Sequence, residues 1–279
     1  MPSFASRVRL ALTESARQKT YVNTLPPEAF DQPTACSRWV VSELIAHLVM
    51  ATGFQTSMMR RGLQGDPSPP EGLPVAGALR APAVTEIVHQ LMLATKQQVG
   101  EQLLPAFNAA YEEIDQFLAR LDASDGDKLC YHPGTLIPVS GFVDLRLMEL
   151  FIHGWDMRSR LEPPAHLPPE SWPVLLDLLP HFLGYMVVPA SQEAEERRYR
   201  FAVTERVADV RDVIVAGGTL RLEAARPTRA QVTFVCDTET FLLLMWGRLA
   251  WETAMADGRV SLEGDHRLAA DFGHWYRVF

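Results

Sequence analysis

The sequence is poor in cysteine, has no excess of basic residues and contains no long apolar run. Its three cysteines, Cys36, Cys130 and Cys236, are far apart and form no CxxC pair, which argues against a disulfide framework and against a thiolate metal site. Of the three, Cys130 is the candidate for a part in function, because its loop CYHPG lies shortly before the motif MELFIHGWDM.

Charge and hydropathy exclude further classes of protein. With 34 acidic and 26 basic residues the net charge is -8, which is unfavourable for binding a phosphate backbone or an anionic membrane. No stretch reaches the roughly 18 uninterrupted apolar residues of a membrane span, and the N-terminal MPSFASRVRLALTES lacks the apolar core of a signal peptide. We therefore expect a cytoplasmic protein without nucleic-acid or membrane partners, and either a monomer or a homodimer.

The 279 residues suffice for two domains of ordinary size. Residues 1–165 show apolar residues at helical spacing between proline-rich breaks, which predicts a four-helix bundle. Pro105 is expected to kink the third helix or divide it in two. The expected helices span residues 3–24, about 40–63, 83–123 and 143–161.

Residues 166–279 have a different pattern. After the proline-rich stretch EPPAHLPPESWP, predicted to be an interdomain linker, a helix is expected at about residues 172–187. The short runs YRFAVT, DVIVAG, TLRLEA and QVTFVCD are rich in β-branched residues and predict strands. A helical pair over 238–258, the run VSLEGD and a short terminal helix complete a smaller α+β domain.

The stretch MELFIHGWDM places Glu149 and His153 four residues apart, and therefore on one face of a helix that is otherwise mostly apolar. His47 lies in a similar setting, ELIAHLVM. Because buried carboxylates and imidazoles need partners, the three residues together predict a metal site with two histidines and one carboxylate. The alternative is that His47 binds a backbone carbonyl and Glu149 pairs with Arg146 or Arg158.

Two segments resemble the mycothiol-dependent maleylpyruvate isomerase family. TACSRWVVSELIAHL is similar to a family pattern that ends in His-Leu, and MELFIHGWDMRSRL to a Glu-x-x-x-His-Gly-x-Asp signature. The segment LLLMWGRLAWETAMADGRVSLEGDHRLAADF resembles the family's C-terminal domain. The resemblance implies a DinB-like four-helix bundle followed by a sterol-carrier-like domain. It also implies a divalent metal such as zinc on His47, Glu149 and His153, with mycothiol or another small thiol as co-substrate.

The resemblance further implies an isomerase or S-transferase acting on a small electrophile. A metal that stabilises a thiolate would support addition to an activated double bond, and rotation and elimination would complete an isomerisation. The alternative is a metal-binding or lipid-binding protein without turnover, acting as a sensor or a carrier.

Other residues have secondary candidate roles. Arg248 is the candidate to bind a substrate carboxylate, although it could equally be a surface arginine that pairs locally. Asp156 is expected to fix either the helix end or the second nitrogen of a ligand imidazole. We expect Trp39 and Trp155 to pack rather than bind substrate. His132 could approach the open side of the site or be a solvated loop residue.

Overall fold

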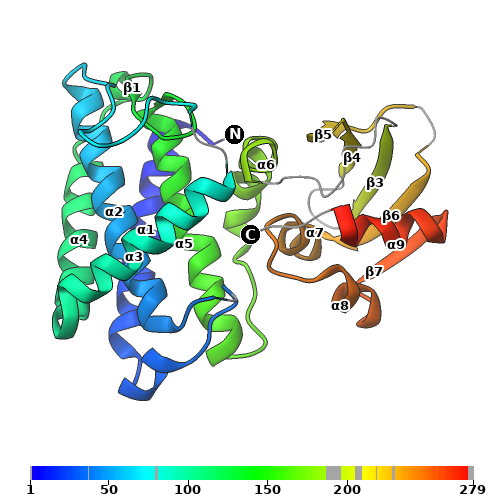
Figure 1. The fold of residues 1–279 in the computed structure, drawn as a ribbon, viewed down its shortest axis with the longest axis horizontal. Coiled ribbons are helices and arrows are strands. Elements are labelled where there is room, and N and C mark those ends of the chain that lie inside the picture. The colour runs from blue at the N-terminus through cyan, green and yellow to red at the C-terminus, as the bar shows by residue number, and fades with distance from the viewer. Residues whose placement is uncertain are drawn as a thin grey trace. The chain divides into compact units, whose positions relative to one another are not determined.

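The structure is a computed structural model that describes residues 2–36, 38–78, 81–186, 196–204, 209–217, 219–227 and 230–275 (Figure 1). The chain divides into two compact units, residues 1–174 and 175–279, and the division falls inside helix α6. The first unit is mostly helical and the second contains a five-stranded sheet, so the predicted fold class is confirmed. No helix in the described ranges combines the length and the apolar character needed to cross a membrane.

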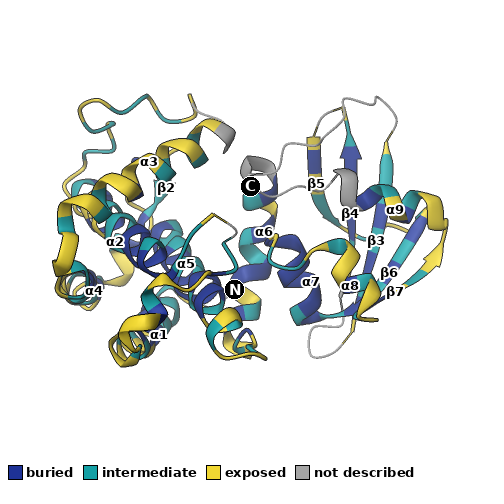
Figure 2. Ribbon diagram, turned by 60° about the horizontal axis from the view of Figure 1, so that its bottom comes forward, coloured by how far each residue is buried: buried dark blue, intermediate teal, exposed yellow. Residues whose placement is uncertain are grey.

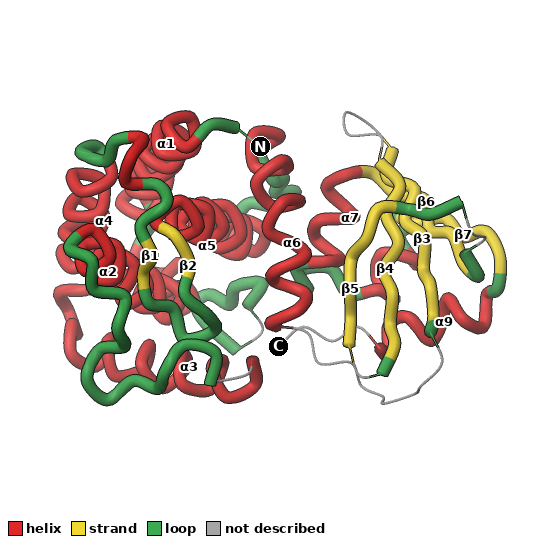
Figure 3. The backbone as a smooth tube through the Cα atoms, turned by 90° about the horizontal axis from the view of Figure 1, so that it is seen from above, coloured by secondary structure: helices red, strands yellow, loops and turns green. Residues whose placement is uncertain are grey.

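The helices of the first unit pack around α2, which contacts α3, α4 and α5, while α1 contacts α4 and α5. Figure 3 shows α2 and α5 nearly end on, with α3 lying across them. A two-residue antiparallel ladder joins β1 to β2 directly before α5. The elements are α1 (Phe4–Thr24), η1 (Pro27–Asp31), α2 (Val41–Leu63), α3 (Ala81–Val99), η2 (Gly100–Gln102), α4 (Leu103–Leu118), η3 (Ala123–Asp125), β1 (Leu129–Cys130), β2 (Ile137–Pro138), α5 (Val139–Leu161) and η4 (Pro169–Ser171).

Apolar side chains on the facing sides of these helices form the core of the first unit, which appears as the dark inner surfaces in Figure 2. Burial of this area is the main stabilising contribution. Polar residues also lie in this core, and their partners are described below. The fully buried apolar residues include Leu44, Ile45, Leu48, Phe107, Tyr111, Ile114, Phe142, Leu147 and Ile152.

Three predicted helix boundaries in the first unit are wrong. The predicted third helix ends at Leu118, the last residue of α4, instead of residue 123. The predicted third helix is divided into α3 and α4 at Gly100, whose φ of 50° is in the left-handed region, and not at Pro105. Pro105 lies in the first turn of α4, where its missing N–H costs no intrahelical hydrogen bond. The predicted fourth helix starts at Val139 instead of residue 143, directly after Pro138.

The second unit contains a sheet of order β5-β4-β3-β6-β7, in which β3 and β6 are parallel and the other neighbours antiparallel. The predicted strands are confirmed, and β4 extends further towards the N-terminus than predicted. The end of the predicted helix at residue 187 lies outside the described residues. The elements are α6 (Trp172–Met186), β3 (Arg197–Thr204), β4 (Asp209–Ala216), β5 (Thr219–Ala224), β6 (Val232–Asp237), α7 (Thr238–Met245), α8 (Trp251–Ala256), β7 (Val260–Gly264) and α9 (His266–Trp275).

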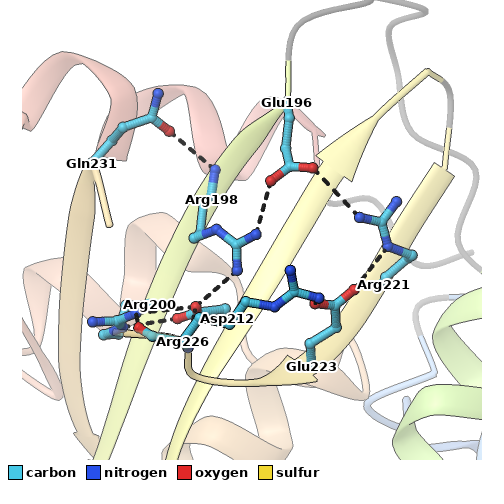
Figure 4. A network of polar contacts seen from close by, with 8 residues as sticks. All are labelled: Glu196, Arg198, Arg200, Asp212, Arg221, Glu223, Arg226 and Gln231. Carbon is cyan, nitrogen blue, oxygen red and sulfur yellow. Dashed lines mark hydrogen bonds and ion pairs between the residues drawn. The ribbon is translucent and has the colours of Figure 1, made fainter. Parts of the chain in front are cut away.

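The two faces of this sheet differ because successive strand residues point to opposite sides. On one face Phe201 and Phe234 pack against Phe241 of α7 and Phe272 of α9. The other face carries a network of charged side chains around Asp212 (Figure 4). The aromatic face of the sheet thus packs against α7 and α9, and ion pairs connect the strands on the charged face.

Candidate metal centre

Helices α2 and α5 bring together the three residues singled out in the sequence. The Nε2 atom of His47, on α2, lies 3.1 Å from Oε2 of Glu149, on α5. The Nε2 atom of His153, one turn further along α5, lies 3.2 Å from the same oxygen. One ligand atom from each residue falls within 4.8 Å of the others. His47 and Glu149, 102 residues apart in sequence, therefore meet with His153 as expected.

The site is almost fully enclosed. The side chains of His47, Glu149 and His153 are exposed by only 8%, 12% and 9%. The apolar neighbours of these residues along α2 and α5 are themselves buried, among them Leu44, Ile45, Leu48, Leu150 and Ile152. A carboxylate in such surroundings needs compensating charge, and the two imidazoles are positioned to supply it.

The pKa values of Glu149 and His153 are shifted by burial and by their contacts with neighbouring groups. Burial by itself raises the pKa of Glu149, but the charge of His47 and the hydrogen bond and charge of His153 outweigh it and hold that pKa well below its usual range. Burial lowers the pKa of His153, whereas hydrogen bonds with Asp156, Cys36 and Glu149 raise it well above its usual value. Glu149 is therefore held in the ionised form that can bind a cation. A cation bound by Nε2 of His153 would displace the proton that the raised pKa favours on that ring.

The spacing of the ligand atoms suits a divalent cation. A tetrahedral zinc ion with bonds of about 2.0–2.1 Å holds neighbouring nitrogen and oxygen ligands about 3.3 Å apart. The two separations around Glu149, 3.1 and 3.2 Å, are close to that value, and without a cation they are hydrogen-bond distances. Two imidazoles and one carboxylate also leave a coordination position for water or substrate. The residues present thus fit a metal with an open position.

Asp156 orients the imidazole of His153. Its side chain is fully buried, and Oδ2 accepts a hydrogen bond of 2.8 Å from Nδ1 of His153. When the ring is neutral this bond holds the proton on Nδ1 and leaves the lone pair of Nε2 directed at the site. Two roles were considered for Asp156, and its contacts support the one in which it binds the second nitrogen of a ligand imidazole.

Cys36 makes a second convergence with His153 and Asp156. The thiol Sγ lies 3.0 Å from Oδ2 of Asp156 and 3.8 Å from Nδ1 of His153. A tetrahedral zinc ion would separate a sulfur and an oxygen ligand by about 3.5 Å. The shorter distances in this group are those of hydrogen bonds, so we interpret it as the support of His153 and not as a further metal site.

Trp39 covers the other histidine. Its ring centroid lies 4.9 Å from that of His47 and 6.3 Å from that of His153, and its Nε1 donates to Nδ1 of His89 on α3 at 3.1 Å. The buried Nδ1 of His47 has no hydrogen-bond partner among the described residues. Away from Glu149, ring packing therefore holds His47, whereas a hydrogen bond to Asp156 holds His153.

Comparison with known proteins now identifies the family. Residues 11–158, more than half of the chain, match the family described as mycothiol maleylpyruvate isomerase N-terminal domain. The chain belongs to this family. Residues 189–275 match the SCP-2 sterol transfer family. The resemblance stated from the sequence is thus confirmed.

A solved structure shows the same fold as this mycothiol maleylpyruvate isomerase family member. The crystal structure of a mycothiol-dependent maleylpyruvate isomerase is similar over 94% of this chain and 96% of that chain, with 15% sequence identity and a TM-score of 0.62. Sterol Carrier Protein-2 like-3 from Aedes aegypti is similar over 36% of this chain and 90% of its own, with 16% identity and a TM-score of 0.27. No curated protein matches the sequence.

The arginines named as alternative partners of Glu149 bind elsewhere in this family member. Arg146 is buried, donates to Thr52 Oγ1 at 2.8 Å, and its guanidinium lies 4.0 Å from the ring centroid of Tyr111. Arg158 lies over the ring of Tyr21 at 4.4 Å. Within the described ranges, Glu149 contacts the two histidines, so the arginine pairing considered as an alternative is not formed.

Three other candidates lie away from the three ligands. Cys130 is buried against Gly62, and burial raises the pKa of its thiol to about 11. His132 packs against Phe142, and burial lowers its pKa to about 4. Trp155 donates to the carbonyl of Ala165 at 3.2 Å, which anchors the predicted linker to the first unit.

Trp155 also borders the cavity of about 120 Å³ between α1 and α5, whose lining includes Gln18 and Gly154 and none of the three ligands. The Trp155 side chain lies on the face of α5 opposite Glu149 and His153. Arg248 belongs to the second unit, follows α7 and donates to the carbonyl of Trp246 at 3.0 Å. Its role in substrate binding stays a prediction.

Sequence reasoning missed Cys36 and His89. The only sequence signal for Cys36 is its place in TACSRW, within the segment that carries the family resemblance. Nothing in the spacing of His89 on its helix indicates that it receives the indole N–H of Trp39.

Proposed function

We propose that this protein is a metal- and thiol-dependent enzyme that isomerises a small electrophile bearing an activated double bond. The single observation that carries the proposal is the convergence of His47, Glu149 and His153 on one point between α2 and α5. The family match supports the thiol and the reaction class, because the family is named for a mycothiol-dependent isomerase. Zinc is the metal we propose, since two nitrogens and one carboxylate oxygen are typical of its catalytic sites.

When bound, the divalent cation lowers the pKa of a small thiol and stabilises its thiolate, the nucleophilic form. The protein holds the two imidazoles and the carboxylate in place, with Asp156 fixing the proton of His153 on Nδ1. The low exposure of the three ligand side chains limits the access of bulk water. Addition of the thiolate to the double bond, rotation about the resulting single bond and elimination would give the isomer and return the thiol.

Arg248 is our candidate for the group that binds a carboxylate of the substrate. A guanidinium presents two parallel N–H donors, which suit a carboxylate. An Arg248→Ala variant should raise KM by about tenfold or more while its metal content stays at the parental value, and Arg248→Lys should recover part of the loss. An unchanged KM in Arg248→Ala would remove this assignment.

The function is tested by incubating zinc-loaded protein with mycothiol and a panel of small unsaturated carboxylates, including maleylpyruvate. We expect isomerisation that requires both metal and thiol and leaves the thiol concentration constant. Glu149→Gln should abolish turnover, whereas the exposed control His181→Ala should retain it. Consumption of the thiol would instead indicate an S-transferase.

A metal-loaded protein without thiol-dependent turnover on any of these substrates would contradict the proposal. That result would favour the alternative of a metal-binding or lipid-binding protein without catalysis, to which the match with the SCP-2 sterol transfer family also points.

A further inference from the structure

The loop between η1 and α2 contacts both histidines of the candidate metal centre. Trp39 packs its ring on His47, and Cys36 directs its thiol to Asp156, the residue that orients His153. The loop thus reaches both ligand helices, although only α2 follows it directly in sequence. This dual contact suggests a role beyond connecting two elements.

Hydrogen bonds within the loop give it a defined shape. The hydroxyl of Thr34 donates to the carbonyl of Trp39 at 2.8 Å and accepts from the N–H of Cys36 at 3.1 Å. The N–H of Trp39 donates to the carbonyl of Cys36 at 2.8 Å, and Thr34 is 3% exposed. A buried threonine therefore fixes the backbone from which the thiol and the indole project.

A backbone bond fastens the same loop to α5. The N–H of Ala35 donates to the carbonyl of Asp156 at 3.0 Å, next to the side-chain bond from Cys36 to the carboxylate. Oδ2 of Asp156 therefore accepts from both the thiol of Cys36 and Nδ1 of His153. Because one oxygen receives both bonds, the direction of the thiol and that of the imidazole are linked through the carboxylate.

We propose that Cys36 is a positioning residue of the metal centre, whose thiol holds the Asp156 carboxylate in the orientation that aims Nε2 of His153 at the metal. The inference rests on the proposed function, because it presupposes that the three ligands bind a cation. Cys36 lies beside Nδ1, whereas Nε2 of His153 faces Glu149, so the thiol acts through Asp156 and is not a ligand of the same ion.

The test measures binding of Zn²⁺ and Co²⁺ to the full-length, metal-free protein by competition with a chromogenic chelator. Cys36→Ala should weaken binding by about tenfold or more, the range found when partners of ligand imidazoles are removed. Cys36→Ser, which retains a donor, should stay within about threefold of the parent. Cys236→Ala, which removes a buried thiol of the second unit, is the matched control and should bind as the parent does.

A double-mutant cycle tests whether the effect passes through Asp156. In the Asp156→Asn background, adding Cys36→Ala should weaken binding by less than about twofold, because the carboxylate on which the thiol acts is already gone. Thermal unfolding in the presence of chelator checks that each variant folds. The ligand-field bands of Co²⁺ should shift in Cys36→Ala and return in Cys36→Ser.

Several results would overturn the proposal. Cys36→Ala could bind as tightly as the parent, the serine variant could be as weak as the alanine variant, or the two substitutions could be fully additive. A sulfur-to-cobalt charge-transfer band that is lost in Cys36→Ala would make the thiol a ligand and would also refute the positioning role. A parent protein that binds no cation would refute the proposed function itself, which separates that failure from the others.

Discussion

At the scale of single residues, Glu149 has the central place in the account. One of its oxygens contacts both imidazoles, and its side chain is 12% exposed. A carboxylate so enclosed is costly unless cations surround it. Its environment contains two groups, His47 and His153, that can either carry protons or bind a metal, and no arginine of the described ranges takes their place.

The substitution Glu149→Gln tests this role with little change in shape. The amide oxygen is uncharged and a poor ligand, so we expect the metal dissociation constant to rise by more than the roughly 10–100-fold typical of residues that only support a ligand. Isothermal titration with zinc gives the value. Glu112→Gln, an exposed change on α4, is the control, and equal binding by both variants would refute the ligand role.

The residues of the site differ in how far the sequence reveals them. His47, Glu149 and His153 could be predicted because each interrupts an apolar helical pattern, which a buried polar group does only with a partner. Cys36 could not, because its partner Asp156 is 120 residues away and meets it only when the loop folds against α5. The thiol chosen from the sequence, Cys130, belongs to a tightly packed corner instead.

At the scale of elements, α2 depends on a close approach at its end. A Cβ added to Gly62 would lie 2.3 Å from Sγ of Cys130 and 2.7 Å from the carbonyl oxygen of Leu129, whereas one added to Gly53 would meet nothing within 4 Å. Gly62 therefore lets β1 pack directly on the helix. The same comparison explains why a Gly within a helical pattern cannot be interpreted from the sequence alone.

The two glycines give a matched pair of variants. Gly62→Ala should destabilise the protein by about 1–3 kcal/mol, the cost of overpacking. Gly53→Ala should stabilise it by up to about 1 kcal/mol, because alanine favours the helix interior. Urea unfolding of the metal-free variants measures both changes. Equal and small effects would contradict the packing described at the end of α2.

In the second unit, Asp212 holds β3 and β4 together through charge. It is fully buried, and although burial raises its pKa, the hydrogen bonds from Arg200 and Arg198 outweigh that effect and lower it (Figure 4). A depressed pKa in the folded state means that the stabilisation is present above the unfolded pKa and is lost as the pH falls through the folded value.

Asp212→Asn should therefore destabilise the protein by about 3 kcal/mol at pH 7, because two guanidinium groups lose their buried partner. The difference from the parent should shrink as the pH is lowered below the normal range of an aspartic acid. Unfolding curves of parent and variant at pH 7 and at a pH below the normal range of an aspartic acid give this comparison. A difference that does not depend on pH would show that the charge of Asp212 is not what stabilises the sheet.

The layout of the elements could be predicted better than their boundaries. The sheet strands and the helices of the first unit follow from apolar periodicity, a property of each segment by itself. The division at Gly100 was missed because proline is the stronger signal for a helix break. Pro105 does not interrupt α4, since it lies in the first turn, where the backbone N–H has no intrahelical partner.

At the scale of the whole molecule, metal binding and folding are linked. The three ligands come from α2 and α5, which pack together only in the folded first unit. A cation that binds the folded state alone stabilises it by about 2.7 kcal/mol when its concentration is 100 times the dissociation constant. Scanning calorimetry should show a higher Tm with zinc in the parent and none of this increase in His47→Ala, and equal increases in both would place the metal elsewhere.

The proposed function depends on one cation bound by Nε2 of His47, Oε2 of Glu149 and Nε2 of His153. The most direct measurement is a crystal structure of zinc-loaded protein with anomalous data collected at the zinc absorption edge. With zinc bound at the proposed centre, we expect one strong anomalous peak about 2.0–2.2 Å from each of these three atoms. No peak at that point, or a peak between Cys36 and Asp156 instead, would contradict it.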